Sequence, residues 1–101
     1  MDSQDHAFMQ EGASEAAALL RAVGNERRLL VLCLLIEHGE LAVGQLLEQV
    51  DLSPSALSQH LTRMRAEGLI DYRRQAQTLY YRIANPAVAE LVATLKRIYC
   101  P

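Results

Sequence analysis

Several kinds of segment are missing from this chain of 101 residues. Residues 1–9 contain two aspartates and no basic residue, whereas a secretory signal has a basic segment followed by an apolar run. The longest uncharged apolar run, Leu29 to Ile36, is far shorter than the ~20 residues that cross a bilayer. We therefore expect a cytoplasmic protein with no membrane partner.

Cysteine is scarce, and linkers and internal repeats are absent. The two cysteines, Cys33 and Cys100, are too few for a disulfide scaffold, and the sequence has no CxxC motif. In a reducing cytosol both should rest as thiols. No Gly/Ser/Pro-rich stretch or repeat divides the chain, and half of its residues are hydrophobic, enough for one small core. We expect one domain over residues 1–101.

The charge of the chain is unevenly distributed, although the net charge is only −2. Residues 1–20 hold four acidic residues and no lysine or arginine. Residues 53–82 hold five arginines against one glutamate and one aspartate, a local charge of +3. Such a basic stripe is typical of a nucleic-acid interface, but arginine clusters are also common on solvated surfaces.

Hydrophobic spacing and capping residues predict five helices and one β-hairpin. The helices are expected over residues 11–23, 26–37, 43–50, 54–67 and 86–100, and the strands over residues 69–73 and 79–84. Residues 1–10 are expected to form a disordered tail. The fold class is therefore mainly α with a small β-hairpin, in the order α-α-α-α-β-β-α. A short turn joins the third and fourth helices and the hairpin follows directly, as in a winged helix–turn–helix.

The helix expected over residues 54–67 has the pattern of a DNA recognition helix. If Leu57 and Leu61 are buried, polar side chains gather on its outer side. Glutamine can pair with adenine, arginine with guanine, and serine with bases or phosphates. The candidate DNA contacts here are Ser53, Ser55, Ser58, Gln59, His60, Thr62 and Arg63. An ordinary amphipathic surface helix would also present such a face, and His60 could instead pack beneath the helix.

The hairpin that follows is the candidate wing. Arg73, Arg74 and Gln77 could reach the DNA backbone or the minor groove beside the recognition helix. The alternative is that the two arginines only make the hairpin soluble. The turn, residues 75–78, lacks glycine, so the sequence does not predict its geometry.

Four segments together resemble the ArsR/SmtB family of bacterial repressors, and the resemblance extends over about residues 15–100. The segments are GNERRL at 24–29, LSPSALSQHL at 52–61, RAEGL at 65–69 and LYYR at 79–82. The resemblance implies a homodimer built on the helices at residues 11–23 and 86–100. It also implies repression by binding double-stranded operator DNA, and release when an inducer arrives.

Metal sensing by the known sites of that family is not expected. One family site uses a Cys-x-Cys type motif, but the matching stretch here, residues 41–44, has no ligand side chain. The other site uses Asp, His and Glu on the last helix, where this chain has only Glu90. The histidines are scattered, and zinc needs three or four converging ligands. We expect no metal and no other cofactor, although a metal-responsive repressor with an unrecognised site remains an alternative.

Cys33 and Cys100 resemble the cysteine pair of the family's dithiol subgroup, which responds to reactive sulfur species or oxidants. The resemblance implies a redox-sensing pair within one protomer and an inducer of one of these two kinds. The alternative is that Cys33 is a plain core residue, because cysteine is often buried as a small hydrophobe. Cys100, one residue from the end of the sequence, is harder to explain by packing.

Other functions have less support from the sequence. A winged helix can also bind a protein instead of DNA. An enzyme is the weakest hypothesis, because no nucleophile–base pair, phosphate-binding loop or metal set is present, and a two-cysteine oxidoreductase would carry CxxC. We therefore predict a DNA-binding transcriptional regulator without catalytic residues.

Overall fold

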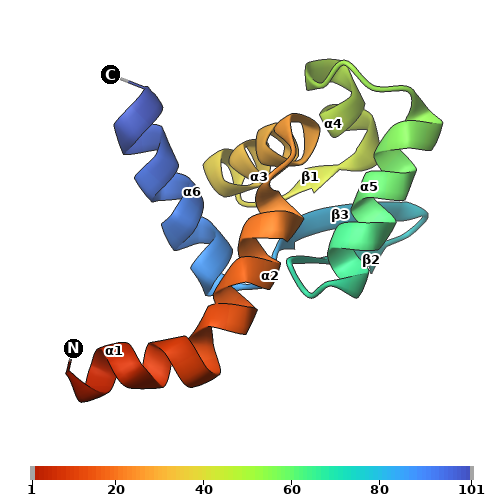
Figure 1. Ribbon diagram of the computed structural model, residues 1–101. Helices are drawn as coiled ribbons and strands as arrows, with labels where there is room; N and C mark the ends of the chain where they lie inside the picture. The colour runs from red at the N-terminus through yellow and green to blue at the C-terminus, as the bar shows by residue number, and fades with distance from the viewer. Residues whose placement is uncertain (1, 101) are drawn as a thin grey trace.

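The computed structural model describes residues 2–100, and Met1 and Pro101 lie outside the described residues. Its helices and strands, in chain order, are α1 (Ser3–Ala7), the π-helical turn η1 (Phe8–Gly12), α2 (Ala13–Val23), α3 (Glu26–His38), β1 (Leu41–Ala42), α4 (Val43–Gln49), α5 (Pro54–Ala66), β2 (Ile70–Gln75), β3 (Thr78–Ile83) and α6 (Pro86–Tyr99). The chain is mainly helical with a small antiparallel hairpin, and the hairpin follows the α4–turn–α5 unit (Figure 1). The predicted winged helix–turn–helix fold is therefore confirmed.

The core is centred on α3. Its residues Val31, Leu32 and Leu35 have no exposed surface. The helix packs against β1, β3 and α6. Helix α3 is therefore the buried centre of the fold, and the other elements are arranged around it.

Three helices begin where side-chain caps predict. Asn25 accepts hydrogen bonds from the backbone N–H groups of Arg27 and Arg28, which opens α3. Ser53 caps α5 and Asn85 caps α6 in the same way, and in both helices a proline follows in the first turn. These bonds satisfy N–H groups that have no partner inside the helix, and a proline at that position has no N–H to satisfy.

The sheet has one strand more than expected. Its order is β1-β3-β2, with β1 pairing through Leu41 opposite Tyr81 and Ala42 opposite Tyr80. A strand of two residues is too short to show an alternating pattern, so β1 has no signal in the sequence. The hairpin closes through a two-residue loop after the pair Gln75–Thr78, and Ala76 takes the positive φ of 56° that glycine usually supplies.

The N-terminal segment differs from the disordered tail expected at residues 1–10. Residues 3–12 are helical and continue into α2, and we call this segment the N-terminal arm. The Asp2 carboxylate starts the helix by accepting a hydrogen bond of 2.9 Å from the N–H of Asp5. No residue of the arm is buried, and the arm and α6 project from the same side of the body (Figure 1). No helix in residues 2–100 is both long and apolar enough to cross a membrane.

Candidate nucleic-acid interface and thiol pair

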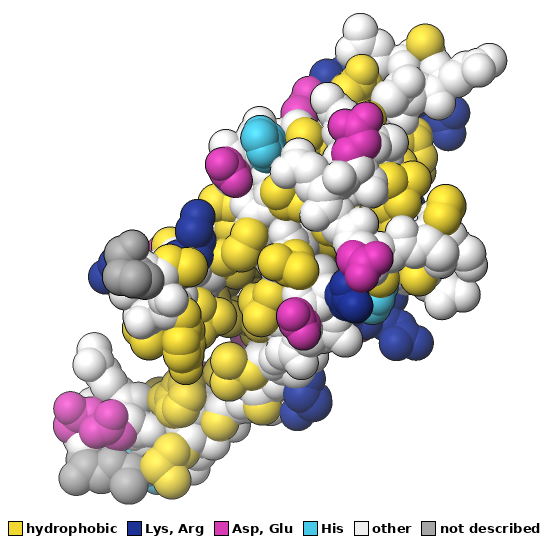
Figure 2. Space-filling model, turned by 90° about the horizontal axis from the view of Figure 1, so that it is seen from above, with side chains coloured by type: hydrophobic (Ala, Val, Ile, Leu, Met, Phe, Trp, Pro, Cys, Tyr) yellow, Lys and Arg dark blue, Asp and Glu magenta, His cyan; other side chains and the backbone are white. Residues whose placement is uncertain are grey.

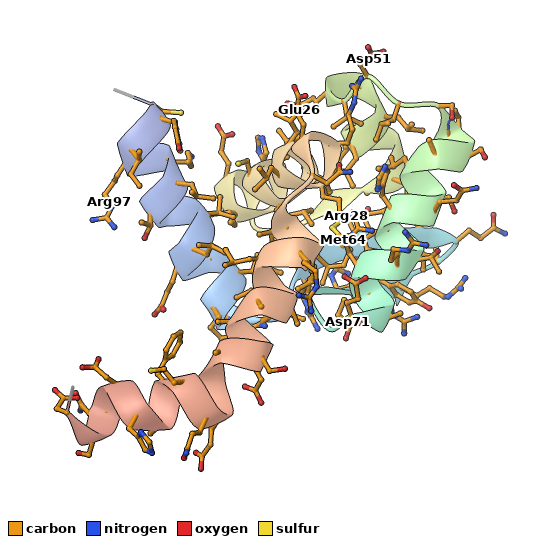
Figure 3. All side chains as sticks on the ribbon, viewed as in Figure 1. Glu26, Arg28, Asp51, Met64, Asp71 and Arg97 are labelled. Atoms are coloured by element: carbon orange, nitrogen blue, oxygen red, sulfur yellow. The ribbon has the colours of Figure 1, made fainter. Side chains whose placement is uncertain are left out.

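Helix α5 presents a polar face to solvent because its apolar residues are buried in the core. Leu57, Leu61 and Met64 are buried, and Figure 3 shows Met64 on the inner side of the helix. On the outer side, the structure leaves the following predicted residues exposed: Ser53, Ser55, Ser58, Gln59, Thr62 and Arg63. Ser53 also has a structural role, since its hydroxyl accepts the N–H of Ala56 at 3.1 Å. The structure thus brings the predicted helix residues together on one surface.

His60 lies between the two positions considered for it. Its side chain is half-buried, and it lines a shallow hollow beside α5 together with Arg63 and Arg28 of α3. The ring is therefore at the border of the polar face and is not enclosed beneath the helix.

The two arginines of the candidate wing have different surroundings. Arg73 forms a two-point contact with Glu40: its Nη2 is 2.6 Å from Oε1 and its Nε is 3.0 Å from Oε2. Its Nη1 donates to the Oε1 of Gln75, and its guanidinium lies over the ring of Tyr80. Arg74 is exposed and has no ion pair among residues 2–100. Arg73 thus ties β2 to the segment before β1, while the charge of Arg74 is free.

The Glu40–Arg73 pair changes the titration of both groups. The hydrogen bonds from Arg73 lower the pKa of Glu40 below its ordinary value, and those to Glu40 raise the pKa of Arg73. The contact between Glu40 and Arg73 was not predicted from the sequence. Glu40 lies 33 residues before Arg73 in the chain, and no local pattern predicts such a pair.

A second contact joins the end of α5 to the start of the wing. Arg65 places its Nε 3.2 Å from the Oδ1 of Asp71 and its guanidinium over the ring of Tyr72, 4.1 Å from the centroid. The N–H of Tyr72 donates to the same carboxylate, and this bond and that of Arg65 lower the pKa of Asp71. Tyr72 meets Tyr81 of β3 edge to face. These contacts join the end of α5 to β2, the first strand of the candidate wing, with Asp71 at the base of α5 (Figure 3).

Arg27 braces the turn between α4 and α5. Its Nη1 donates to the backbone carbonyl of Asp51 at 2.9 Å and lies 3.9 Å from the Asp51 carboxylate. Asp51 lies 24 residues after Arg27 in the chain, so no local pattern in the sequence predicts this contact.

The thiols belong to two helices that pack together: Cys33 lies in the middle of α3, and Cys100 directly follows α6. Cys33, on α3, is half-buried against the core, and Cys100, directly after α6, is exposed; both are free. Burial raises the pKa of Cys33, which Lys96 of α6 opposes, while Cys100 and Glu37 raise it further. The thiol of Cys100 is thus the one that a reagent in solvent meets first. No group of three or more His, Cys, Asp or Glu that could hold a metal occurs within the described part of the chain.

A large apolar surface lies on the helices that the sequence analysis assigned to dimerisation. Leu20 of α2 is 57% exposed, and Ile98 and Tyr99 of α6 are 64% and 76% exposed. Phe8 and Met9 of the N-terminal arm are exposed to a similar extent. Other small or apolar residues of the same two helices are half-buried within the single chain: Ala13, Ala16, Ala17, Leu91 and Leu95. Figure 2 shows hydrophobic side chains gathered between the arm and α6.

Comparisons with known proteins agree with this geometry. Residues 25–72 match the family described as "Bacterial regulatory protein, arsR family". The chain is 50% identical to the HTH-type transcriptional regulator YgaV of Escherichia coli (strain K12), over 94% of this chain and 96% of that protein. It is 44% identical to the transcriptional activator HlyU of Vibrio cholerae, over 91% and 84% of the two chains.

Solved structures give the same result for the fold. The reduced form of HlyU from Vibrio cholerae N16961 superposes with a TM-score of 0.86 at 42% identity, covering 94% of this chain and 99% of that one. The transcriptional repressor BigR of Xylella fastidiosa gives a TM-score of 0.87 at 35% identity, covering 100% and 99%. These similar proteins are transcriptional regulators and not enzymes.

The Glu40–Arg73 contact predicts a specific pH dependence. In an NMR titration, the carboxyl of Glu40 should protonate at lower pH than an ordinary glutamate, and Arg73→Gln should return its pKa toward the ordinary value. Because the pKa is lowered in the folded state, the pair stabilises the fold at neutral pH, and this contribution disappears as the pH falls through the folded pKa. The difference in free energy of unfolding between wild type and Arg73→Gln should therefore narrow on acidification. Arg74→Gln is the matched control and should leave Glu40 unchanged; equal titration of Glu40 in wild type and Arg73→Gln would contradict the assignment.

Proposed function

Since this chain belongs to the arsR family of bacterial regulatory proteins, we propose that it is a cytoplasmic homodimeric repressor that reads operator DNA with α5. The observation that carries the proposal is the exposed polar face of α5, which is held in a fixed relation to the wing by the Arg65–Asp71 contact. A recognition helix needs this combination, because base contacts in the major groove require both free side chains and a defined approach angle.

The residues of α5 divide by the chemistry of their side chains. Gln59 and Arg63 are the candidates for base contacts, since glutamine and arginine can bond two atoms of a base edge at once. The hydroxyls of Ser53, Ser55, Ser58 and Thr62 and the ring of His60 are suited to phosphates or to single bonds with bases. The free backbone N–H groups at the start of α5 can also donate hydrogen bonds to a phosphate.

The wing supplies contacts that do not depend on sequence. Arg74 and Gln77 are exposed, and a free arginine beside the recognition helix is suited to a phosphate or to the minor groove. Arg73 belongs to this group through its position, but its charge is already paired with Glu40. We assign it mainly to holding the wing in place.

The dimer is proposed through α2, α6 and the N-terminal arm. Leucine, isoleucine and tyrosine side chains that are more than half exposed are costly in water, and a second copy of the same face would cover them. A two-fold dimer would place its two recognition helices about one DNA turn apart, ~34 Å, which fits a palindromic operator.

The thiol pair is proposed as the sensor that releases DNA. With a peroxide, the Cys100 thiolate attacks one oxygen and gives a sulfenic acid and hydroxide. The Cys33 thiol then attacks that sulfur, and a disulfide and water are formed. With a hydropersulfide, the Cys100 thiolate attacks the outer sulfur, the S–S bond of the donor breaks, and the donor leaves as its thiolate while Cys100 becomes a persulfide. The Cys33 thiol then attacks the Cys100 sulfur, and a disulfide forms as hydrosulfide and a proton are released. The support is positional: one thiol is exposed, and both belong to the packed pair α3 and α6.

Substitutions in α5 and in the wing should have different effects on DNA binding. Gln59→Ala and Arg63→Ala should weaken binding to operator DNA by ~1–3 kcal/mol for each contact that bonds two atoms of a base, with little loss on unrelated DNA. Arg74→Ala should weaken binding to all sequences alike and lower the salt dependence. Binding isotherms with DNA from upstream of the protein's own gene, at several salt concentrations, measure both effects. His38→Ala, at the exposed end of α3, is the control; equal loss on specific and unrelated DNA for the α5 variants would show that α5 does not read bases.

Treatment of the protein with peroxide or persulfide should release it from DNA only if both cysteines are present. Wild type should gain an intramolecular cross-link in mass spectrometry and lose operator affinity in a gel shift, and reductant should restore both. Cys33→Ser and Cys100→Ser should stay bound, because neither can close the bridge. If either single variant is released, or if treated wild type stays bound, the two cysteines are not the switch.

A further inference from the structure

Arg28 is the only charged residue that is buried in the described part of the chain. It lies in the first turn of α3 and is 8% exposed. Burying an arginine is costly unless its N–H groups are bonded, because the charge gives up its contact with water. The contacts of the Arg28 guanidinium should therefore show why it is buried.

The partners of Arg28 come from two different helices. Its Nη1 donates to the backbone carbonyl of Ala22 at 3.0 Å, in the last turn of α2, where carbonyls have no partner inside their own helix. The same nitrogen lies 3.6 Å from the Oε2 of Glu67, the residue that ends α5. The Nε of Arg28 is buried and has no hydrogen-bond partner. Figure 3 shows Arg28 in the interior, between α2 and α5.

Few other contacts fix α2 to the body of the protein. Val23 is its one buried residue, and Leu19 and Ala22 are partly buried against the core. The direction of α2 relative to α5 thus depends on its last turn, and Arg28 bonds that turn. The guanidinium is rigid and planar, so it can hold two partners at a defined angle, which a flexible ammonium group cannot do.

We infer that Arg28 is a positioning residue that sets the direction of the recognition helix α5 relative to the dimerisation helix α2. The inference rests on the proposed function, in which α2 forms the dimer and α5 reads DNA. In a two-fold dimer, a small rotation of α5 relative to α2 is doubled across the axis. The contact of Arg28 with Ala22 and Glu67 then determines which operator spacing the dimer accepts.

The test measures how strictly each variant selects operator spacing. Wild-type protein first enriches a duplex from random-sequence DNA, and that duplex is then lengthened or shortened by one base pair at its centre. Wild type should bind the altered duplexes much more weakly than the selected one. Arg28→Met should bind the selected duplex about tenfold more weakly and should distinguish the three spacings poorly. Glu67→Gln and Arg28→Lys should show the same loss of discrimination to a smaller degree.

Controls separate positioning from folding and from dimerisation. Glu37→Gln, a change of an exposed glutamate on α3 that is matched to Glu67→Gln, should behave as wild type. Circular dichroism and sedimentation equilibrium should show a folded dimer for each variant, and Glu67→Gln and Arg28→Lys decide the question if Arg28→Met does not fold. If these variants distinguish the three spacings as strictly as wild type does, the inference is wrong and the proposed function stands. Failure of the wild type to enrich any duplex would overturn the proposed function and the inference with it.

Discussion

The burial of helix α3 is the constraint on which the rest of the structure depends. Val31, Leu32 and Leu35 are completely enclosed, and each such side chain contributes about 1.5–3 kcal/mol when it leaves water. The sheet and α6 pack around this helix. Arg27 connects it to the turn before α5, and Arg28 connects it to the residue that ends α5. Any displacement of α3 relative to α6 must therefore reach α5. This arrangement supports the proposal that a thiol on α3 influences the proposed DNA-binding face of α5.

Some arginines of this acidic chain form ion pairs within the fold, and others are exposed and unpaired. Arg27, Arg28, Arg65 and Arg73 are paired with carboxylates from other elements and connect the turn, α5 and the hairpin to the rest of the fold. Arg63, Arg74 and Arg82 are exposed and have no ion pair within residues 2–100. Three unpaired arginines thus remain in residues 53–82, where both acidic residues, Glu67 and Asp71, are paired. The paired arginines also limit the motion of the hairpin, and a surface that is already ordered loses less entropy on binding.

Local signals in the sequence predicted most of the fold, and contacts between distant residues accounted for what it missed. The cap residues Asn25, Ser53 and Asn85 bond N–H groups two or three residues later in the chain. Such local contacts leave a pattern in the sequence, so the starts of α3, α5 and α6 could be predicted. Strand β1 has two residues and exists only because β3 lies beside it. The pairing of Arg73 with Glu40 and the burial of Arg28 have no local signature either. Residues 1–10 were expected to form a disordered tail, yet residues 3–12 are helical, with an Asp2 cap and an uninterrupted run into α2.

The central claim is that two copies of α5 read one face of DNA together across a two-fold axis. Hydroxyl-radical footprinting of the reduced protein on a duplex that it has enriched tests this claim most directly. The account predicts two protected patches related by symmetry, with centres about one helical turn, ~34 Å, apart. A single protected patch, or protection without a two-fold pattern, would contradict it.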